Sequence, residues 1–322
     1  MSKAVTVSFE FFPPNDAGMA DQLWSAVLRL APLRPRFVSV TYGADGSTRS
    51  RTHDLVMRIR RETDLLVAPH LTCVGAPREE VIGIARDYWR CGVRHLVALR
   101  GDAPASSPAA AGTPGAGPGT GTPGPDAAGS ARVGCRYQPH PGGFAYASDL
   151  VGGLKSAGEF EISVAAYPEG HPESGSVEAD LANLKRKIDA GATRAITQFF
   201  FDPEVFLRYR DRCAASGVAA SIVPGILPIT RFPQMLRFAE RCGASVPAWL
   251  RRRFEGLDED PETRRMIAAH VAIEQVQLLR QHGVDEFHFY TLNRAELTYA
   301  ICHALGLRPC APAAGAAPRV SA

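Results

Sequence analysis

Near the N-terminus, residues 5–11 read Val-Thr-Val-Ser-Phe-Glu-Phe and alternate apolar with polar side chains. Successive side chains of a β-strand point to opposite faces, so this alternation predicts a strand with one apolar and one polar face. Glu10 lies on the polar face, next to the last residue of the predicted strand. We expect the apolar face to pack against helices, which leaves the carboxylate to point into the space that the sheet encloses.

Seven further segments have the composition of strands, because each is short, rich in β-branched or aromatic residues, and bounded by glycine, proline or polar residues. They are residues 36–41, 65–71, 95–99, 161–166, 194–200, 221–226 and 286–290. Amphipathic stretches with helical spacing lie between most of them, for example at residues 81–89 and 266–278. Glycines expected to end such helices in the left-handed conformation are Gly92, Gly191, Gly217 and Gly283.

Eight alternating units of this kind favour a closed, parallel (β/α)8 barrel, the TIM barrel, over a doubly wound open sheet. No Gly-x-Gly-x-x-Gly pattern follows the first strand, which also disfavours a Rossmann domain. The sequence therefore predicts an α/β protein with a single barrel domain over residues 1–308.

Two segments differ in composition from the rest of the chain. Residues 103–145, after the fourth predicted strand, and the tail at residues 309–322 consist mostly of small residues, glycine and proline. Such segments bury too little apolar surface to offset the entropy lost on ordering. We therefore expect a flexible insert and a disordered tail, and roughly 265 residues remain for a barrel that typically needs ~250.

Composition excludes several other classes of protein. The 322 residues are 45% hydrophobic and carry a formal net charge of +3, too little to favour a nonspecific nucleic-acid binder. No apolar run approaches the ~20 residues that cross a membrane, and the N-terminus has no apolar signal segment. The 7 cysteines contain no Cys-x-x-Cys pair, so we predict neither disulfides nor a metal site, and a cytoplasmic location.

Chemistry in a TIM barrel gathers at the C-terminal ends of the strands. Polar groups follow nearly every predicted strand: Glu10, Thr41, Tyr42, His70, Arg100, Asp102, Tyr167, Gln198, Tyr290 and Arg294. A carboxylate inside a barrel is costly unless it is paired, hydrated or protonated. Desolvation is expected to raise the pKa of Glu10 and make it a proton donor, and a salt bridge with an arginine is the structural alternative.

Other groups allow both a functional and a structural interpretation. Arg100–Asp102 combines a phosphate-binding side chain with a glycine that permits close approach, but an Arg–Asp pair in a turn explains it as well. Asp180, Asn183 and Lys187 share one face of a predicted helix, either as a solvated surface or as a ribose and phosphate strip. Residues 287–290 are interpreted as core and rim packing.

Eight strings at successive strand ends together closely resemble the bacterial methylenetetrahydrofolate reductases. They are Ser8–Pro14, Ser39–Gly43, Pro69–Cys73, Ala98–Asp102, Ala165–Pro172, Thr197–Asp202, Pro224–Pro228 and Phe287–Arg294. The resemblance extends from about residue 5 to residue 309, apart from the insert, which is longer here than the corresponding loop of the family. It implies a barrel without the C-terminal regulatory domain of eukaryotic relatives.

The resemblance also implies the reaction. The family binds FAD, takes hydride from NADH or NADPH, and reduces 5,10-methylenetetrahydrofolate to 5-methyltetrahydrofolate in a ping-pong cycle that supplies methionine synthesis. By this resemblance Glu10 is the general acid, and Asp102 is the carboxylate near flavin and pterin. Small-molecule substrates and a homo-oligomer are implied, and neither nucleic acid nor membrane is expected as a partner.

Binding residues are likewise implied by the resemblance. The cofactor contacts are Thr41, Tyr42, His70, Arg100, Gly101, Asp102, Tyr146, Ala147, Tyr167, His171, Asp180, Asn183, Arg186 and Lys187. The substrate contacts are Gln198, Gln234, Phe238 and Arg294. Two alternatives stay open: a related flavin barrel that oxidises an amino acid such as proline, and a catalytically silent barrel that serves as a binding partner.

Overall fold

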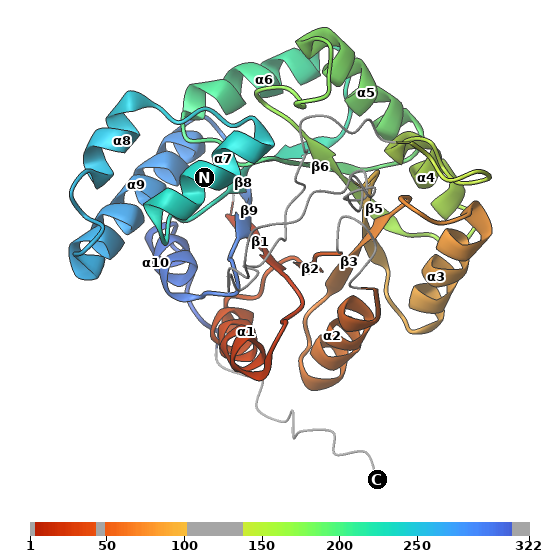
Figure 1. Cartoon of the computed structure of the whole chain (residues 1–322), viewed down its shortest axis with the longest axis horizontal. Helices are drawn as coiled ribbons and strands as arrows, with labels where there is room; N and C mark the ends of the chain where they lie inside the picture. Colours follow the sequence, from red (N-terminus) through yellow and green to blue (C-terminus); the bar gives the residue numbers. More distant parts are fainter. Residues whose placement is uncertain (1–3, 43–48, 102–137, 311–322) are drawn as a thin grey trace, which may run out of the picture.

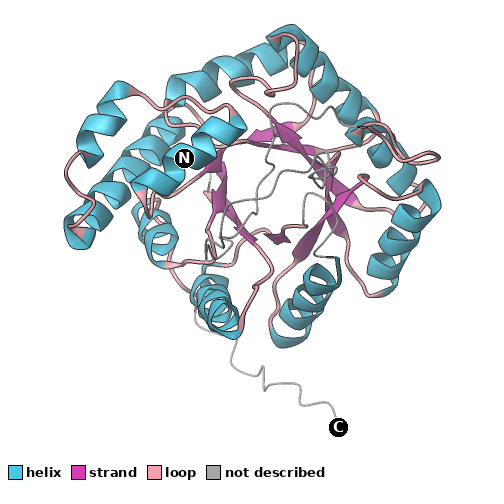
Figure 2. Cartoon of the chain, viewed as in Figure 1, coloured by secondary structure: helices cyan, strands magenta, loops and turns pink. Residues whose placement is uncertain are grey.

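Among the residues that the computed structural model describes, which are 4–42, 49–101 and 138–310, nine parallel strands form a single sheet. The order of the strands is β7-β6-β5-β4-β3-β2-β1-β9-β8. Figures 1 and 2 show the strands arranged in a ring, with the helices around its outside. The predicted TIM-type α/β fold is therefore confirmed.

The strands are β1 (Thr6–Phe11), β2 (Val38–Val40), β3 (Val67–Thr72), β4 (His95–Leu99), β5 (Glu161–Ala166), β6 (Arg194–Thr197), β7 (Ser221–Val223), β8 (Gly225–Ile226) and β9 (Glu286–Tyr290). The helices are α1 (Ala17–Leu30), η1 (Ala31–Leu33), α2 (Arg49–Glu62), α3 (Arg78–Arg90), α4 (Ala147–Leu154), α5 (Val177–Asp189), α6 (Pro203–Ala215), α7 (Phe232–Cys242), α8 (Ala248–Phe254), α9 (Pro261–Gln281) and α10 (Glu296–Ala304).

The predicted strand at residues 221–226 is divided at Pro224 into β7 and β8. A proline has no backbone N–H to give to a neighbouring strand, so the ladder breaks there. β7 pairs with β6 and β8 pairs with β9, while the backbone N–H of His288 donates to the Pro224 carbonyl at 3.0 Å. The two halves of one predicted strand thus bring the ends of the sheet together and nearly close the barrel.

The first strand has the two faces that its sequence predicts. Val7, Phe9 and Phe11 are buried in the large core between the sheet and the helices. Inside the barrel lies a separate small apolar layer, formed by Phe37, Ala68, Val97 and Ile196 with Leu99 packed on it. Polar side chains fill the barrel above and below this layer, and the site depends on that division.

Local signals in the sequence also correspond to the structure. The four glycines predicted to end helices all have positive φ, between 72° and 119°. Most of the predicted insert lies outside the described residues, but residues 138–145 are described. Among these, Phe144 is buried in the main core, and the Gly143 carbonyl accepts a hydrogen bond from Arg78 Nε at 3.0 Å. No helix in the described parts is long and apolar enough to span a membrane.

Candidate active site

The backbone that carries Glu10 is fixed by the segment that follows β9. Thr291 Oγ1 donates to the Glu10 carbonyl at 2.6 Å, and Asn293 Nδ2 donates to the Phe12 carbonyl at 2.9 Å. The Phe12 N–H donates back to Asn293 Oδ1 at 3.0 Å. Leu292 and Asn293 have φ values of 50° and 55°, a conformation that residues other than glycine adopt uncommonly. Two residues in the left-handed conformation thus align the polar groups that hold the end of β1.

The Glu10 side chain points into the barrel, where it is 12% exposed and faces two imidazoles. Its Oε2 lies 3.3 Å from His70 Nε2 and 3.5 Å from His288 Nε2, and it accepts a hydrogen bond from Ser39 Oγ at 3.4 Å. These partners come from β3, β9 and β2, so the predicted inward orientation is confirmed. The structural alternative of a salt bridge with an arginine is wrong, because both ion-pair partners among the described residues are histidines.

The expected direction of the Glu10 pKa is wrong. Burial raises the pKa, as predicted, but contact with His288 and the charge of His70 outweigh burial and lower it to about 2. The sequence prediction accounted for desolvation and omitted the two imidazoles. In the structure Glu10 is therefore ionised at neutral pH, and a proton for chemistry has to come from a neighbouring group.

His288 is a site residue that the sequence analysis missed, because its segment was interpreted as packing. It is fully buried, and its Nδ1 lies 2.8 Å from Ser8 Oγ. The register pairs Ser8 with His288 and Glu10 with Tyr290 across β1 and β9. The alternation of Phe287–Tyr290 could have revealed it, since His288 and Tyr290 share a face opposite the two phenylalanines.

The structure brings four predicted cofactor contacts together where β4 and β5 end. Burial lowers the pKa of Lys187 to about 8, with the charge of Asp180 opposing and that of Arg100 adding to the shift. Lys187 Nζ donates to the Ala165 carbonyl at 2.6 Å. Burial, together with Arg100, also lowers the pKa of the His171 imidazole. The α5 strip is therefore half-buried against the strand ends rather than a free surface.

Six further predicted cofactor contacts follow β2, β4 and β5 or lie on α5. Thr41 and Tyr42 are buried after β2, and Gly101 after β4 has a φ of 86°. The Tyr167 ring contacts the His171 ring edge to face, with centroids 4.6 Å apart. Arg186 hydrogen-bonds to Asn183 on α5.

Two contacts at the border of the insert differ from this group. Tyr146 is 63% exposed, and its backbone N–H donates to Asp149 Oδ2 at 3.0 Å where α4 begins with Ala147. Asp102, the predicted second catalytic residue, lies outside the described residues.

Two of the predicted substrate contacts share a recess at the mouth of the barrel. Gln234 and Phe238, one turn apart on α7, line it together with Arg231 and Leu292. Gln198 follows β6, and its Oε1 accepts a hydrogen bond from the backbone N–H of residue 199 at 3.0 Å. Arg294 follows β9 with an exposed side chain and does not line this recess.

Tyr290 crosses the mouth because Gly225 has no side chain. Tyr290 Oη donates to the Thr197 carbonyl at 2.8 Å. A Cβ on Gly225 would lie 2.1 Å from that carbonyl oxygen and 2.6 Å from the tyrosine ring. Glycine at this position thus allows β6, β8 and the Tyr290 side chain to meet beside Glu10.

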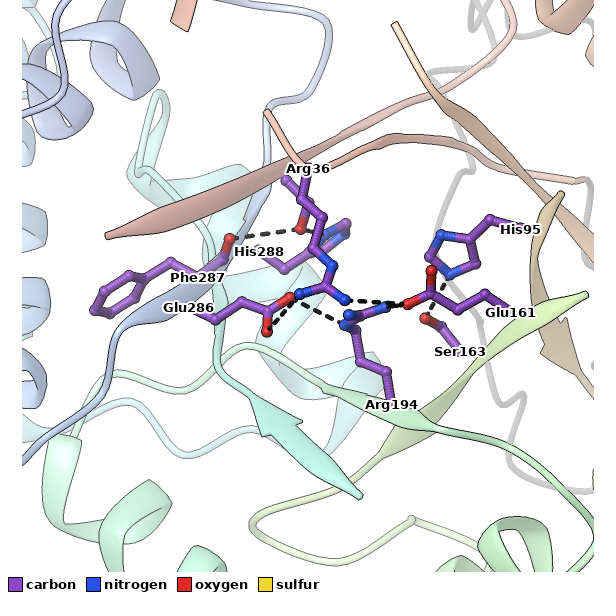
Figure 3. A network of polar contacts seen from close by, with 9 residues as sticks. Arg36, His95, Glu161, Ser163, Arg194, Glu286, Phe287 and His288 are labelled. Carbon is purple, nitrogen blue, oxygen red and sulfur yellow. Dashed lines mark hydrogen bonds and ion pairs between the residues drawn. The ribbon is translucent and has the colours of Figure 1, made fainter. Parts of the chain in front are cut away.

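A second polar cluster occupies the opposite, N-terminal end of the barrel (Figure 3). Arg194, only 3% exposed, forms ion pairs with Glu161 and with Glu286, the latter at 2.9 Å. Arg36 approaches the same two carboxylates at 3.5 and 3.9 Å. Each charge has an opposite charge beside it, so this cluster is a closed structural network between β5, β6, β9 and the segment that precedes β2.

The sequence matches known proteins over nearly its whole length. The sequence profile described as methylenetetrahydrofolate reductase matches residues 1–116 and 130–306. A 5,10-methylenetetrahydrofolate reductase of Pectobacterium carotovorum is 52% identical over 305 residues, covering 95% of this chain and 91% of the relative. The Escherichia coli protein of that name is 50% identical over 305 residues, covering 95% and 92%.

More distant relatives extend the comparison. The Arabidopsis thaliana protein named methylenetetrahydrofolate reductase (NADH) 1 is 33% identical over 93% of this chain, which spans 48% of that protein. A Clostridium thermocellum structure, described as binding two copies of 5-methyl-5,6,7,8-tetrahydrofolic acid, superposes with a TM-score of 0.60 over 95% of this chain and 96% of the other. Its 12% sequence identity makes this a likeness of fold. By its sequence over nearly its whole length, the chain belongs to the methylenetetrahydrofolate reductase family.

Proposed function

We propose that this enzyme reduces 5,10-methylenetetrahydrofolate to 5-methyltetrahydrofolate through FAD, with NADH or NADPH as reductant, and that its product supplies methionine synthesis. The observation that carries the proposal is the carboxylate of Glu10, which lies inside the barrel mouth between two imidazoles. Reduction of the methylene group consumes one hydride and one proton, so an acid–base cluster beside the hydride carrier is the chemistry that this reaction requires.

The residues at the ends of β4 and β5 fit a flavin dinucleotide. Arg100 and Lys187 supply positive charge for a pyrophosphate, and the buried Asp180 carboxylate supplies a hydrogen-bond acceptor for sugar hydroxyls. Gly101, with its positive φ, permits a ligand to approach the backbone closely. When bound, FAD supplies the two-electron carrier between nicotinamide and folate.

The chain's own residues then have separate tasks. Glu10 delivers a proton to nitrogen 10 of the folate, which opens the five-membered ring and leaves a cationic iminium at nitrogen 5. Gln234 and Phe238 line the recess that receives the flat part of the substrate. By the family resemblance, Asp102 stabilises the cation, Gln198 and Arg294 contact the folate, and Gln198 also contacts the nicotinamide.

Under this proposal the nicotinamide and the folate would use the same site in turn, so the kinetics are ping-pong. Purified enzyme should be yellow, NADH or NADPH should bleach it without oxygen, and methylenetetrahydrofolate should restore the colour. A colourless protein that takes up no FAD would contradict the proposal. Bleaching by proline and not by a reduced nicotinamide would instead favour an amino-acid dehydrogenase.

A further inference from the structure

The Glu10 carboxylate faces two buried nitrogen atoms whose hydrogen bonding is incomplete. Nε2 of His70 and Nε2 of His288 are both enclosed, and neither makes an aligned hydrogen bond with a described residue. Both lie within 3.5 Å of the same oxygen, Glu10 Oε2. Buried polar atoms without such a bond are rare in native proteins, and a catalytic role is one of the explanations for them.

The protonation of His288 can be derived from its other contacts. Ser8 Oγ lies 3.5 Å from the Phe287 carbonyl, to which it can only donate, and 2.8 Å from His288 Nδ1. A hydroxyl that donates to a carbonyl presents its lone pairs to the imidazole, so Nδ1 carries a hydrogen. A neutral ring of that tautomer would direct a bare Nε2 lone pair at an ionised carboxylate. This repulsion disappears when one additional proton lies between Nε2 and Oε2.

The surroundings of His288 keep its ring in place. The Phe37 ring lies nearly parallel to it, with centroids 6.0 Å apart, and the Tyr290 ring meets it edge-on at 5.3 Å. The charged and titratable groups that face this region are Glu10, His70, His95, Tyr290 and, beyond Phe37, Arg194.

Arg194 is neutralised by its two carboxylates, as Figure 3 shows for the cluster beside His288. Among the residues that the structure describes, Glu10 is therefore the negative charge in contact with the His288 ring.

We propose that His288 is the positioning residue that stores the proton of the reaction and passes it from Nε2 to Glu10. This inference rests on the proposed function. In each turnover His288 Nε2 gives its proton to the ionised Glu10 carboxylate, which passes it to the folate nitrogen, and the His288 ring is then reprotonated from solvent. The proton balance closes, because reduction of one methylene group by one hydride consumes one proton. The Ser8 hydroxyl fixes the tautomer of the His288 ring, so Ser8 takes part in the same proton transfer.

The test is His288→Gln in the FAD-loaded enzyme, with the two half-reactions followed separately across pH. We expect the folate half-reaction to slow by about 10–100-fold, at or below the lower end of the range for positioned acid–base groups, and its pH profile to change. The NADH half-reaction should stay within about twofold of wild type. An unchanged folate rate and pH profile, or an equal fall in both half-reactions, would overturn the proposal.

A matched control exists in the same barrel. His95 is also buried, and its Nε2 lies 2.8 Å from Ser163 Oγ, but burial lowers its pKa to about 3. His95 therefore shares burial and a serine contact with His288, and its ion-pair and hydrogen-bond partners do not include Glu10. His95→Gln should keep the wild-type pH profile of the folate half-reaction, whatever it does to stability.

A second measurement does not depend on turnover. Nitrogen-15 NMR of histidine side chains in the flavin-free protein should show His288 as an imidazolium that becomes a neutral Nδ1–H ring in Glu10→Gln. Ser8→Ala, a smaller change to the core than the substitution of Glu10, should reduce the imidazolium signal of His288. A neutral Nε2–H ring in the wild type would overturn the proposal. If the wild type shows the imidazolium but reduces no folate, the proposed function fails and the proton store stands.

Discussion

The two ends of the barrel contain the same kinds of side chain in opposite states. At the N-terminal end, Arg194 lies between two carboxylates and each charge is matched. At the C-terminal end, one carboxylate faces two imidazoles whose Nε2 atoms make no aligned hydrogen bond among the described residues. The small apolar layer around Phe37 separates the two clusters. A saturated network stabilises a fold, whereas an incompletely satisfied one is available for proton transfer.

We therefore expect changes at the C-terminal end, the mouth of the barrel, to alter chemistry, and changes at the N-terminal end, its base, to alter stability. The largest effect is expected for Glu10→Gln, which removes the proton donor and keeps the shape of the side chain. Turnover of methylenetetrahydrofolate should fall by roughly 10²–10⁴-fold, the usual contribution of a positioned acid. Rapid-mixing absorbance should show the NADH half-reaction intact. If both half-reactions fell equally, Glu10 would not be the acid.

At the base, Arg194→Met should lower the free energy of unfolding by about 3 kcal/mol, because it leaves two carboxylates facing each other. Arg36→Met is the matched control, since the Arg36 side chain is 47% exposed and its longer ion pairs contribute at most about 1 kcal/mol. Urea denaturation measures both, and turnover per folded molecule should equal that of wild type. Equal stability of the two variants would show that burial of the pair has no effect.

Low pH should destabilise the protein through Glu10 at the mouth of the barrel. Folding lowers the pKa of Glu10 from 4.5 to about 2, so the ionised carboxylate stabilises the fold above about pH 4.5. That contribution, of the order of 3 kcal/mol, is lost as the pH falls from 4.5 toward 2. Unfolding measured from pH 6 to pH 2.5 should show the stability gap between wild type and Glu10→Gln shrinking. A constant gap would mean that the imidazoles do not hold Glu10 ionised.

The smallest effect is expected at the predicted cofactor strip. Lys187→Met should weaken FAD binding by about 10–100-fold, the worth of one charged hydrogen bond, in a fluorescence titration of the apoprotein. Because the pKa of Lys187 is about 8, wild-type affinity should decline above that pH. Lys185→Met, which removes an exposed lysine paired with Asp189 on the same helix, should bind FAD normally. Equal affinities for the two variants would contradict the assignment of the strip.

Much of this architecture was predictable because it depends on short-range rules. Alternation in Val5–Phe11 placed Glu10 inside the barrel, and glycines after helices predicted their left-handed ends. The break at Pro224 was not predicted, although a proline cannot donate to a neighbouring strand. The role of Tyr290 was missed as well, because its contact with Thr197 depends on the space left by a glycine 65 positions away.

The sequence by itself determined the barrel, its polar mouth and the family, since these follow from periodicity and from strings of adjacent residues. Only the tertiary structure decided the state of Glu10. Its two imidazoles come from residues 60 and 278 positions further along the chain, and no local pattern joins them to it. Their proximity reverses the direction of its pKa, because electrostatic interaction depends on distance in space rather than on separation along the sequence.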